Sequence, residues 1–278
     1  MAFACALLAP GASAQAVNGP AHSGAYTTKY VQLVIFENEG YGRVVGNSQA
    51  PYLTGLAKRW ANMTDSRAIA HPSQPNYLAL FSGSTQGVTG DDCPVNFSAP
   101  NLGSELIEAG LSFTGYAESM PRDGFEGCVA QPTRLPSGFL YARKHVPWTD
   151  FTRVPKADNV VYRHPLAAPL SRFVWITPDM CNDMHDCSIG RGDRWAARNL
   201  PALIAWDEAN DGVLVITFDE NDGSPVNRIA TILIGNVNPG QYSQSIDHYN
   251  VLRTIENIFG VEPLGAAASA APIYGVVR

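Results

Sequence analysis

Short apolar runs alternate with helical patterns along most of the chain. Uninterrupted apolar and β-branched runs predict strands at residues 31–36, 173–177, 212–218 and 229–234. Helical periodicity predicts helices at residues 51–61, 76–81, 102–109, 193–206 and 248–259. Strands this apolar are typical of a parallel sheet buried on both faces. The alternation therefore predicts an α/β sandwich with a mostly parallel sheet.

Residues 91–170 do not follow this pattern. They are rich in Pro, Gly and isolated charges and have weak periodicity, so they indicate long loops or a small loop-rich insertion over the sheet. We found no internal repeat, and the Ala-rich stretch 265–271 is typical of a surface connection. A single domain spanning residues 17–278 is the simplest organisation for a chain of 278 residues.

The first sixteen residues, MAFACALLAPGASAQA, form an apolar run that ends in small residues. This run resembles the apolar core and cleavage site of a secretory signal, although a basic start is missing, as in an N-terminally truncated signal peptide. The alternative is a merely apolar tail. No other apolar stretch approaches the ~18 residues that span a bilayer. We therefore expect a secreted, soluble protein, most simply a monomer, without a transmembrane segment.

Charge and cysteine content narrow the function. A formal charge of -6, with only 19 scattered basic residues, excludes a strong grip on nucleic acid. Four cysteines remain after the signal: Cys93, Cys128, Cys181 and Cys187. An even number in an exported protein favours disulfides, and no CxxC spacing supports a thiolate zinc site. Of the three possible pairings, Cys93 with Cys128 and Cys181 with Cys187 is preferred because each closes a local loop.

Polar residues follow the strongest predicted strands at their carboxyl ends, where open parallel sheets bind ligands. Glu37 and Asn38 follow the first strand, and Asp219 and Glu220 follow the strand 212–218. Converging carboxylates repel one another unless a cation neutralises them, and their oxygens suit a divalent metal ion. Any single residue of this kind can instead cap a helix or lie in a solvated turn. Two such clusters favour a divalent metal site, whose metal the sequence does not identify.

Ser73 lies between Pro72 and Pro75, just before a predicted helix. Free amides and the helix dipole favour an anion at such a position, so a phosphoryl group fits there. A helix-capping serine in a proline-bounded turn is the alternative. The Gly-x-Ser-x-Gly signature of serine hydrolases does not occur, because the segment 83–87 places Thr85 at its centre.

Few histidines are present, and two of them adjoin acidic residues. His185 lies in the acidic run after the strand 173–177, and His248 follows Asp247 at the start of the last helix. Imidazole there can ligate a metal, bind phosphate or protonate a leaving group, or be structural. Lys144 and His145 belong to a compact basic patch that can contact phosphate oxygens or simply be solvated.

Six segments in this order resemble the bacterial phosphoesterase family of acid phosphatases and phospholipases C. The segments are HPSQPNYLALFSGS, the Glu37–Asn38 strand end, YARKHVPW, NDMHDCSIGRGDRW, VITFDENDG and DHYNVLRTIENIFG. Their spacing is most similar to that of secreted acid phosphatases that act on phosphatidylinositol 3-phosphate. The resemblance covers the chain from about residue 30 to its C-terminus, and it implies a three-layer α/β/α fold like that of alkaline phosphatase.

The resemblance also implies roles for individual residues. Ser73 matches the nucleophile and Asn76 a phosphate-contacting asparagine, while His185 and His248 match histidines around the phosphate. The residues that match metal-binding strand ends are Glu37, Asn38, Asp219 and Glu220, and Asp183 falls near a second-metal ligand. Lys144 and His145 are expected to bind substrate. Glu220 stands where the wider superfamily has histidine, and Asp183-x-His185 is a shorter spacing than its Asp-x-x-x-His, so a full two-zinc centre is not implied.

The expected reaction is attack of Ser73 on phosphorus beside a metal, followed by hydrolysis of the phosphoserine with His185 or His248 carrying protons. The expected substrate is a phosphate monoester, with a phosphoinositide at a membrane surface as one form. Three alternatives stay open: a phospholipase C-type phosphodiesterase, a metal-independent carboxylesterase using Ser73, His248 and Asp247, and a non-catalytic binding protein on this fold.

Overall fold

The structure, a computed structural model, describes residues 26–278. The expected signal segment, residues 1–16, lies outside the described residues. The strands are β1 (Tyr30–Phe36), β2 (Ala61–Arg67), β3 (Phe113–Ala117), β4 (Val129–Pro132), β5 (Phe139–Ala142), β6 (Asn159–Val161), β7 (Phe173–Thr177), β8 (Gly212–Phe218), β9 (Arg228–Gly235) and β10 (Gly240–Ile246). The α-helices are α1 (Tyr41–Val44), α2 (Pro51–Arg59), α3 (Ser73–Ser82), α4 (Leu102–Glu108), α5 (Ile189–Asn210) and α6 (His248–Phe259). Four 3₁₀ turns are η1 (Arg143–His145), η2 (Pro147–Asp150), η3 (Lys156–Asp158) and η4 (Gly265–Ser269).

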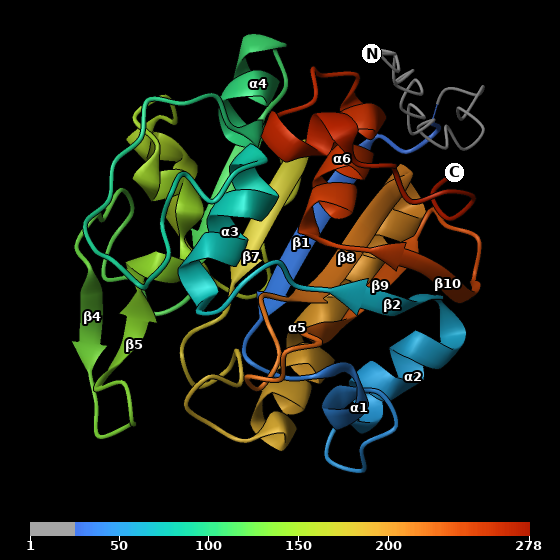
Figure 1. Ribbon diagram of the computed structural model, residues 1–278, viewed down its shortest axis with the longest axis horizontal. Coiled ribbons are helices and arrows are strands. Elements are labelled where there is room, and N and C mark those ends of the chain that lie inside the picture. The colour runs from blue at the N-terminus through green and yellow to red at the C-terminus, as the bar shows by residue number, and fades with distance from the viewer. Residues whose placement is uncertain (1–25) are drawn as a thin grey trace, which may run out of the picture.

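Eight strands form one sheet in the order β10-β2-β9-β8-β1-β7-β3-β6 (Figure 1). Strand β9 runs antiparallel to both of its neighbours, β8 and β2, while the other pairs are parallel. The expected mostly parallel sheet is therefore confirmed. Helices that connect parallel strands cover both faces of the sheet. The central strands β1, β7 and β8 are accordingly buried almost throughout.

The two faces of the sheet carry different helices. On β1, Tyr30 and Phe36 lie on one face and make edge contacts with Trp206 and Trp195 of α5. On the other face, Trp175 of β7 contacts the ring of Tyr77 in α3, and α3 packs against α6. Because successive side chains of a strand point to opposite faces, this arrangement gives three layers, α/β/α, as expected.

The segment 91–170, expected to be a loop-rich insertion, is partly a component of the core. It supplies α4 and the sheet strands β3 and β6, while β4 and β5 form a separate two-stranded ladder. Strand β3 escaped the sequence pattern because it contains Gly115, where a Cβ atom would lie only 2.2 Å from the Trp148 ring. Close packing against Trp148 requires glycine at this position, so the short strand lacks one of the apolar residues by which a strand is predicted.

The remaining expected elements agree with the structure within a few residues at each end. All four predicted strands and all five predicted helices are present, and α6 has the predicted bounds. Strand β2 was missed because its sequence, ANMTDSR, is polar, and the edge strand β10 because its sequence, GQYSQSI, is also mostly polar.

Both preferred disulfides are confirmed, Cys93–Cys128 and Cys181–Cys187. Among the described residues, we found no helix with the length and apolar character needed to cross a bilayer.

Candidate active site

The sequence-predicted site residues gather at the carboxyl end of the sheet, beside the first turn of α3. Glu37 directly follows β1, and the alternation along this strand directs its side chain to the face covered by α3. Asp219 directly follows the neighbouring strand β8, and its amide donates a hydrogen bond to the Phe36 carbonyl. The register of the two parallel strands thus brings both acidic residues to the same point.

Ser73 is the first residue of α3 and is buried, with 2% of its surface exposed. Its hydroxyl donates a hydrogen bond to Glu37 Oε2 at 3.0 Å, and Glu220 Oε1 lies at 3.4 Å. The amide of the next residue, Gln74, donates to Asp91. The serine expected to be a nucleophile therefore points at the strand-end carboxylates and does not cap its own helix.

The acidic side of the site, which we call the acidic half, consists of Glu37, Asp219 and Glu220 beside Ser73. The Asn38 amide donates to Asp219 Oδ1 at 3.0 Å, while Asp219 Oδ2 is buried without a hydrogen-bond partner among the described residues. Glu220 pairs with His71. Asn38 takes part through its backbone, in the left-handed conformation at φ 53°.

A second group, which we call the imidazole half, lies on the other side of Glu37 and consists of His145, Asp183 and His185. His145 Nε2 is 3.3 Å from Glu37 Oε1, and His145 Nδ1 is 3.6 Å from Asp183 Oδ2. The His145 ring stacks on Tyr77 with ring centres 5.1 Å apart. His145, expected to bind substrate, is thus only 1% exposed and faces carboxylates.

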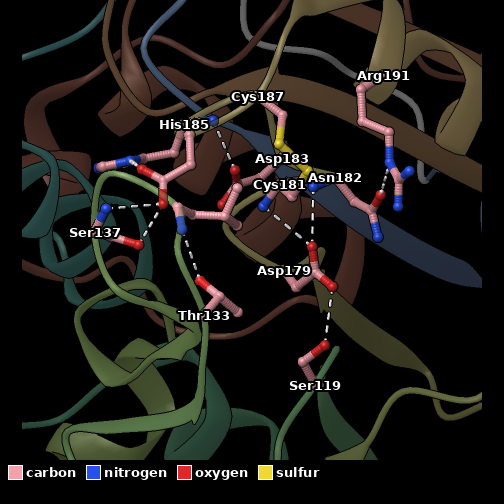
Figure 2. Close-up of a disulfide and its surroundings, with 12 residues drawn as sticks. Ser119, Thr133, Ser137, Asp179, Cys181, Asn182, Asp183, His185, Cys187 and Arg191 are labelled. Carbon is pink, nitrogen blue, oxygen red and sulfur yellow. Dashed lines mark hydrogen bonds and ion pairs between the residues drawn. A yellow bond between two sulfur atoms is a disulfide. The ribbon is translucent and has the colours of Figure 1, made fainter.

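His185 and Asp183 lie within the loop closed by the Cys181–Cys187 disulfide (Figure 2). His185 Nδ1 is hydrogen-bonded to Asp186 at 2.9 Å, and Asp186 also accepts from the Ser137 amide. This contact fixes the ring so that Nε2, which lies 3.5 Å from Lys144 Nζ, faces the site. A carboxylate behind an imidazole is typical of metal-binding histidines.

Burial and mutual repulsion raise the pKa of the carboxyl groups. Glu37 has a pKa well above its usual value because of burial and because Asp219 and Asp183 are close. Burial likewise raises the pKa of Asp183 well above its usual range, and that of Asp219. Burial and Asp219 raise the pKa of Glu220 to about 7. So many carboxyl groups at one place favour a bound cation.

His145 completes the case for a cation. Burial, assisted by the charges of Lys144 and His185, holds its pKa well below the usual value, which keeps the ring neutral and able to ligate. Three buried polar atoms of the site have no hydrogen-bond partner among the described residues: Asp219 Oδ2, Asp183 Oδ2 and His145 Nε2. Such atoms are rare in folded proteins unless a ligand satisfies them.

The donor atoms also fit a metal ion by distance. Glu37, His145 and His185 each offer a ligand atom, and these atoms lie within 4.8 Å of one another. Mixed imidazole and carboxylate donors suit zinc, manganese or iron better than calcium. The residues present therefore fit a divalent transition-metal ion, with Glu37 shared between the two halves.

Two expected site residues have other neighbours. The Asn76 amide group accepts from the amides of Ile69 and Ala70 and donates to the carbonyls of Ala70 and Pro72. These four bonds exhaust its hydrogen-bonding capacity, so it orders the loop before Ser73. His248 is buried, and its Nε2 lies 2.7 Å from the Asp219 carbonyl oxygen.

The geometry contradicts the carboxylesterase alternative. Asp247 caps α6 by accepting from the amides of Tyr249 and Asn250. Because His248 bonds the Asp219 backbone and Ser73 bonds Glu37, the three residues do not form a serine-histidine-aspartate relay in this structure.

Sequence reasoning missed three contributors. Tyr77 donates to Glu37, His71 pairs with Glu220, and Asp91 accepts from Lys144 Nζ at 2.7 Å. Tyr77 had a signal in the sequence, because it stands four residues after Ser73 and so lies on the same side of the helix. His71 and Asp91 have no such periodic signal.

Comparison with known proteins identifies the class to which this chain belongs. The family model described as the phosphoesterase family matches residues 43–262. The chain belongs to this family, which confirms the resemblance noted in the sequence. Solved structures with the same fold include a protein of the alkaline phosphatase superfamily from Vibrio parahaemolyticus, with a TM-score of 0.57, 12% identity, and coverage of 90% of this chain and 70% of that one. A sulfatase from Pseudoalteromonas sp. has a TM-score of 0.56 at 13% identity, covering 89% of this chain and 71% of that one.

Curated relatives are named as phosphatases. The chain is 44% identical to a phosphatidylinositol-3-phosphatase from Mycobacterium tuberculosis over 99% of this chain and 91% of that protein. It is 29% identical to a probable acid phosphatase of Kluyveromyces lactis over 88% of this chain and 61% of that protein. It is 32% identical to a phosphate-repressible acid phosphatase of Penicillium chrysogenum over 77% of this chain and 55% of that protein. The chain thus spans between half and two thirds of the length of these fungal relatives.

Proposed function

We propose that the protein is a phosphoric monoester hydrolase, an acid phosphatase that uses Ser73 as its nucleophile. The observation that carries this proposal is the hydrogen bond from Ser73 Oγ to Glu37, inside a cluster of buried carboxylates and imidazoles with unpartnered atoms. A helix N-terminus beside a cation-binding cluster suits a phosphate ester, because both attract its negative charge.

The residues of the chain divide the work. Ser73 attacks phosphorus after its proton passes to a neighbouring carboxylate, and Glu37 Oε2 is the acceptor already in contact. Lys144 remains cationic, because Glu37, Asp91 and Asp219 outweigh the effect of burial on its pKa and raise it. Its charge balances the phosphoryl oxygens as the phosphoserine forms and the alcohol leaves. Water then releases phosphate by attack from the vacated side.

A divalent metal, held by Glu37 with Asn38, Asp219 and Glu220 or with His145 and His185, would lower the pKa of the serine and neutralise charge. With the metal held in the acidic half, Nε2 of His185 is free to deliver the proton to the leaving alcohol, and we assign this role to the partly exposed His185 in preference to the fully buried His248. His248 and Asn76 are proposed as positioning residues, for Asp219 and for the loop before Ser73.

The proposed physiological substrate is phosphatidylinositol 3-phosphate. The support is the 44% identity over nearly the whole chain to a phosphatase of that name. An extracellular location is proposed as well, because two disulfides persist best in an oxidising compartment.

Turnover of p-nitrophenyl phosphate, its bis diester and short-chain phosphatidylinositol 3-phosphate tests the proposal. We expect hydrolysis of both monoesters, little hydrolysis of the diester, and loss of activity after exhaustive chelation with recovery on adding metal. Ser73→Ala should reduce turnover at least about a thousandfold, whereas Ser98→Ala, on an exposed loop, should be silent. Full activity in Ser73→Ala would show that Ser73 is not the nucleophile. Preference for the diester would indicate a phospholipase C-type enzyme.

A further inference from the structure

One face of α5 gathers cationic side chains away from Ser73. Arg191, Arg194 and Arg198 stand at helical spacings of three and four, so they share one face of the helix. They line a cavity of about 500 Å³, which we call the arginine cavity, together with His164 and Trp195. The opposite side of α5 is used differently, since Asp193 accepts from the amides that begin α2.

These guanidinium groups are available for a ligand. Among residues 26–278, none of the three guanidinium groups lies within ion-pair distance of a carboxylate. Arg191 Nε donates a hydrogen bond to Asn182 Oδ1 at 2.8 Å. The carboxyl in the lining, Glu118, accepts from the Asp179 amide and from Asn182. Three unneutralised guanidinium groups on a chain of net charge -6 form an exceptional local concentration of positive charge.

The spacing of the arginines indicates the class of ligand. Seven residues of helix separate Arg191 from Arg198, a rise of about 10 Å at about 1.5 Å per residue. A small molecule with two or more phosphate groups can engage guanidinium groups carried along this length of helix more fully than a single phosphate group can. Arginine is also the side chain best suited to phosphate, because its planar group donates two parallel hydrogen bonds.

The cavity is separate from the candidate active site but adjoins its disulfide-closed loop. In the view of Figure 2, Arg191 and Asn182 lie on one side of the Cys181–Cys187 disulfide and His185 and Ser137 on the other. Asn182 immediately precedes Asp183 of the imidazole half. A ligand bound to Arg191 would therefore lie against the loop that carries Asp183 and His185, without entering the space beside Ser73.

We propose that the arginine cavity is a second anion-binding site, which takes a small molecule bearing at least two phosphate groups, either free or as a lipid headgroup. This site is distinct from the place where the ester is cleaved, and its existence does not depend on the proposed function.

Isothermal titration calorimetry with inositol 1,4,5-trisphosphate tests the site, using metal-loaded protein in the Ser73→Ala background and monitoring phosphate release. The informative change is the double variant Arg194→Gln/Arg198→Gln, which spares the Arg191 contact with Asn182. We expect its affinity for the probe to be at least tenfold weaker. The matched control Arg134→Gln/Arg153→Gln removes the same charge from exposed positions far along the sequence and should change affinity less than threefold. Melting temperatures verify that both double variants are folded.

Lys144→Gln distinguishes this cavity from the candidate active site. It should leave the affinity for inositol trisphosphate within threefold if the probe binds in the arginine cavity. Equal weakening by both arginine double variants, or weakening by Lys144→Gln alone, would overturn the proposal. Sedimentation with phosphatidylcholine vesicles, with and without phosphatidylinositol 4,5-bisphosphate, identifies the source: binding that needs both the lipid and Arg194 and Arg198 indicates a headgroup, and binding of the soluble probe alone indicates a free phosphate ester.

Discussion

The two halves of the candidate site are built in different ways. The acidic half follows directly from β1 and β8, whose paired backbones fix Glu37 and Asp219 next to each other. The imidazole half comes from η1 and from the loop after β7, neither of which lies in the sheet ladder. The paired strands fix the positions of Glu37 and Asp219, whereas residues on loops must be held by other means.

Those means are visible around His145 and His185. A disulfide closes the loop of Asp183 and His185, and a hydrogen bond from the Arg143 amide to the Cys128 carbonyl ties η1 to the second disulfide. The Arg143 side chain is buried and paired with Asp150 at 2.9 Å. The imidazole half should therefore be the more sensitive to loss of covalent and polar supports, and the acidic half to loss of its charges.

Glu37→Gln should have the largest effect, because Glu37 touches both halves and the serine. We expect kcat/KM to fall about a thousandfold, equivalent to about 4 kcal/mol of transition-state stabilisation. The same change should raise the melting temperature of metal-free protein, since it removes one of several buried, mutually repelling carboxyl groups. Kinetics and thermal melts measure both effects, with Glu262→Gln at an exposed position as the control. A lower melting temperature with the lost activity would mean that Glu37 is mainly structural.

Much of the acidic half could be predicted from sequence, because an apolar run that ends in Glu37 or Asp219 specifies both strand and site. The part played by Asn76 could not, since an amide next to a nucleophile looks the same whether it turns toward phosphate or toward its own loop. His145 was assigned to substrate because its neighbours are basic, yet the 3₁₀ turn η1 directs it inward against Tyr77. Strand β3 was not predicted because it contains Gly115, a glycine that is required by its close contact with Trp148. Long-range packing, which no local pattern records, decided each of these cases.

His145→Asn tests whether the imidazole half acts as a unit. We expect kcat/KM to fall about a hundredfold and the bound metal, measured by elemental analysis, to decrease, because a neutral ligand is lost. Asp183→Asn alone should cost a similar factor, since its Oδ2 faces the same ring at 3.6 Å. The double variant should lose much less than the product of the two factors. Independent, multiplying losses would show that the two residues serve different purposes.

Removing each disulfide separates positioning from stability. In the loop-closure description, Cys93–Cys128, with a separation of 35 residues, stabilises the fold by about 4 kcal/mol, and Cys181–Cys187, with a separation of 6, by about 2 kcal/mol. Activity should respond in the opposite order. We expect Cys181→Ser/Cys187→Ser to lower kcat/KM about tenfold, because Asp183 and His185 lie inside its loop, and Cys93→Ser/Cys128→Ser to lower it less. Denaturant unfolding measures the loss of stability in both variants, and kinetics measures the loss of activity. If the variant that loses more stability also loses more activity, the short disulfide has no separate role in positioning Asp183 and His185.

Glu256 provides the smallest effect and a contrast with both halves, because it is a buried carboxyl of α6 that belongs to neither half. Its Oε1 accepts from the Leu264 amide, its Oε2 has no partner among the described residues, and burial raises its pKa to about 7 from an ordinary value of 4.5. As pH rises through this window, the unfolded chain releases the proton first, so the folded state loses stability up to about pH 7. The loss should be about 2 kcal/mol, given about 1.4 kcal/mol for each unit and some solvent screening. Glu256→Gln lacks this dependence on pH. Urea unfolding should therefore show that the free energy of unfolding of the variant, relative to that of wild type, rises by about 2 kcal/mol between pH 4.5 and pH 8. The kcat should be unchanged. A difference independent of pH would mean that Glu256 ionises normally in the folded protein.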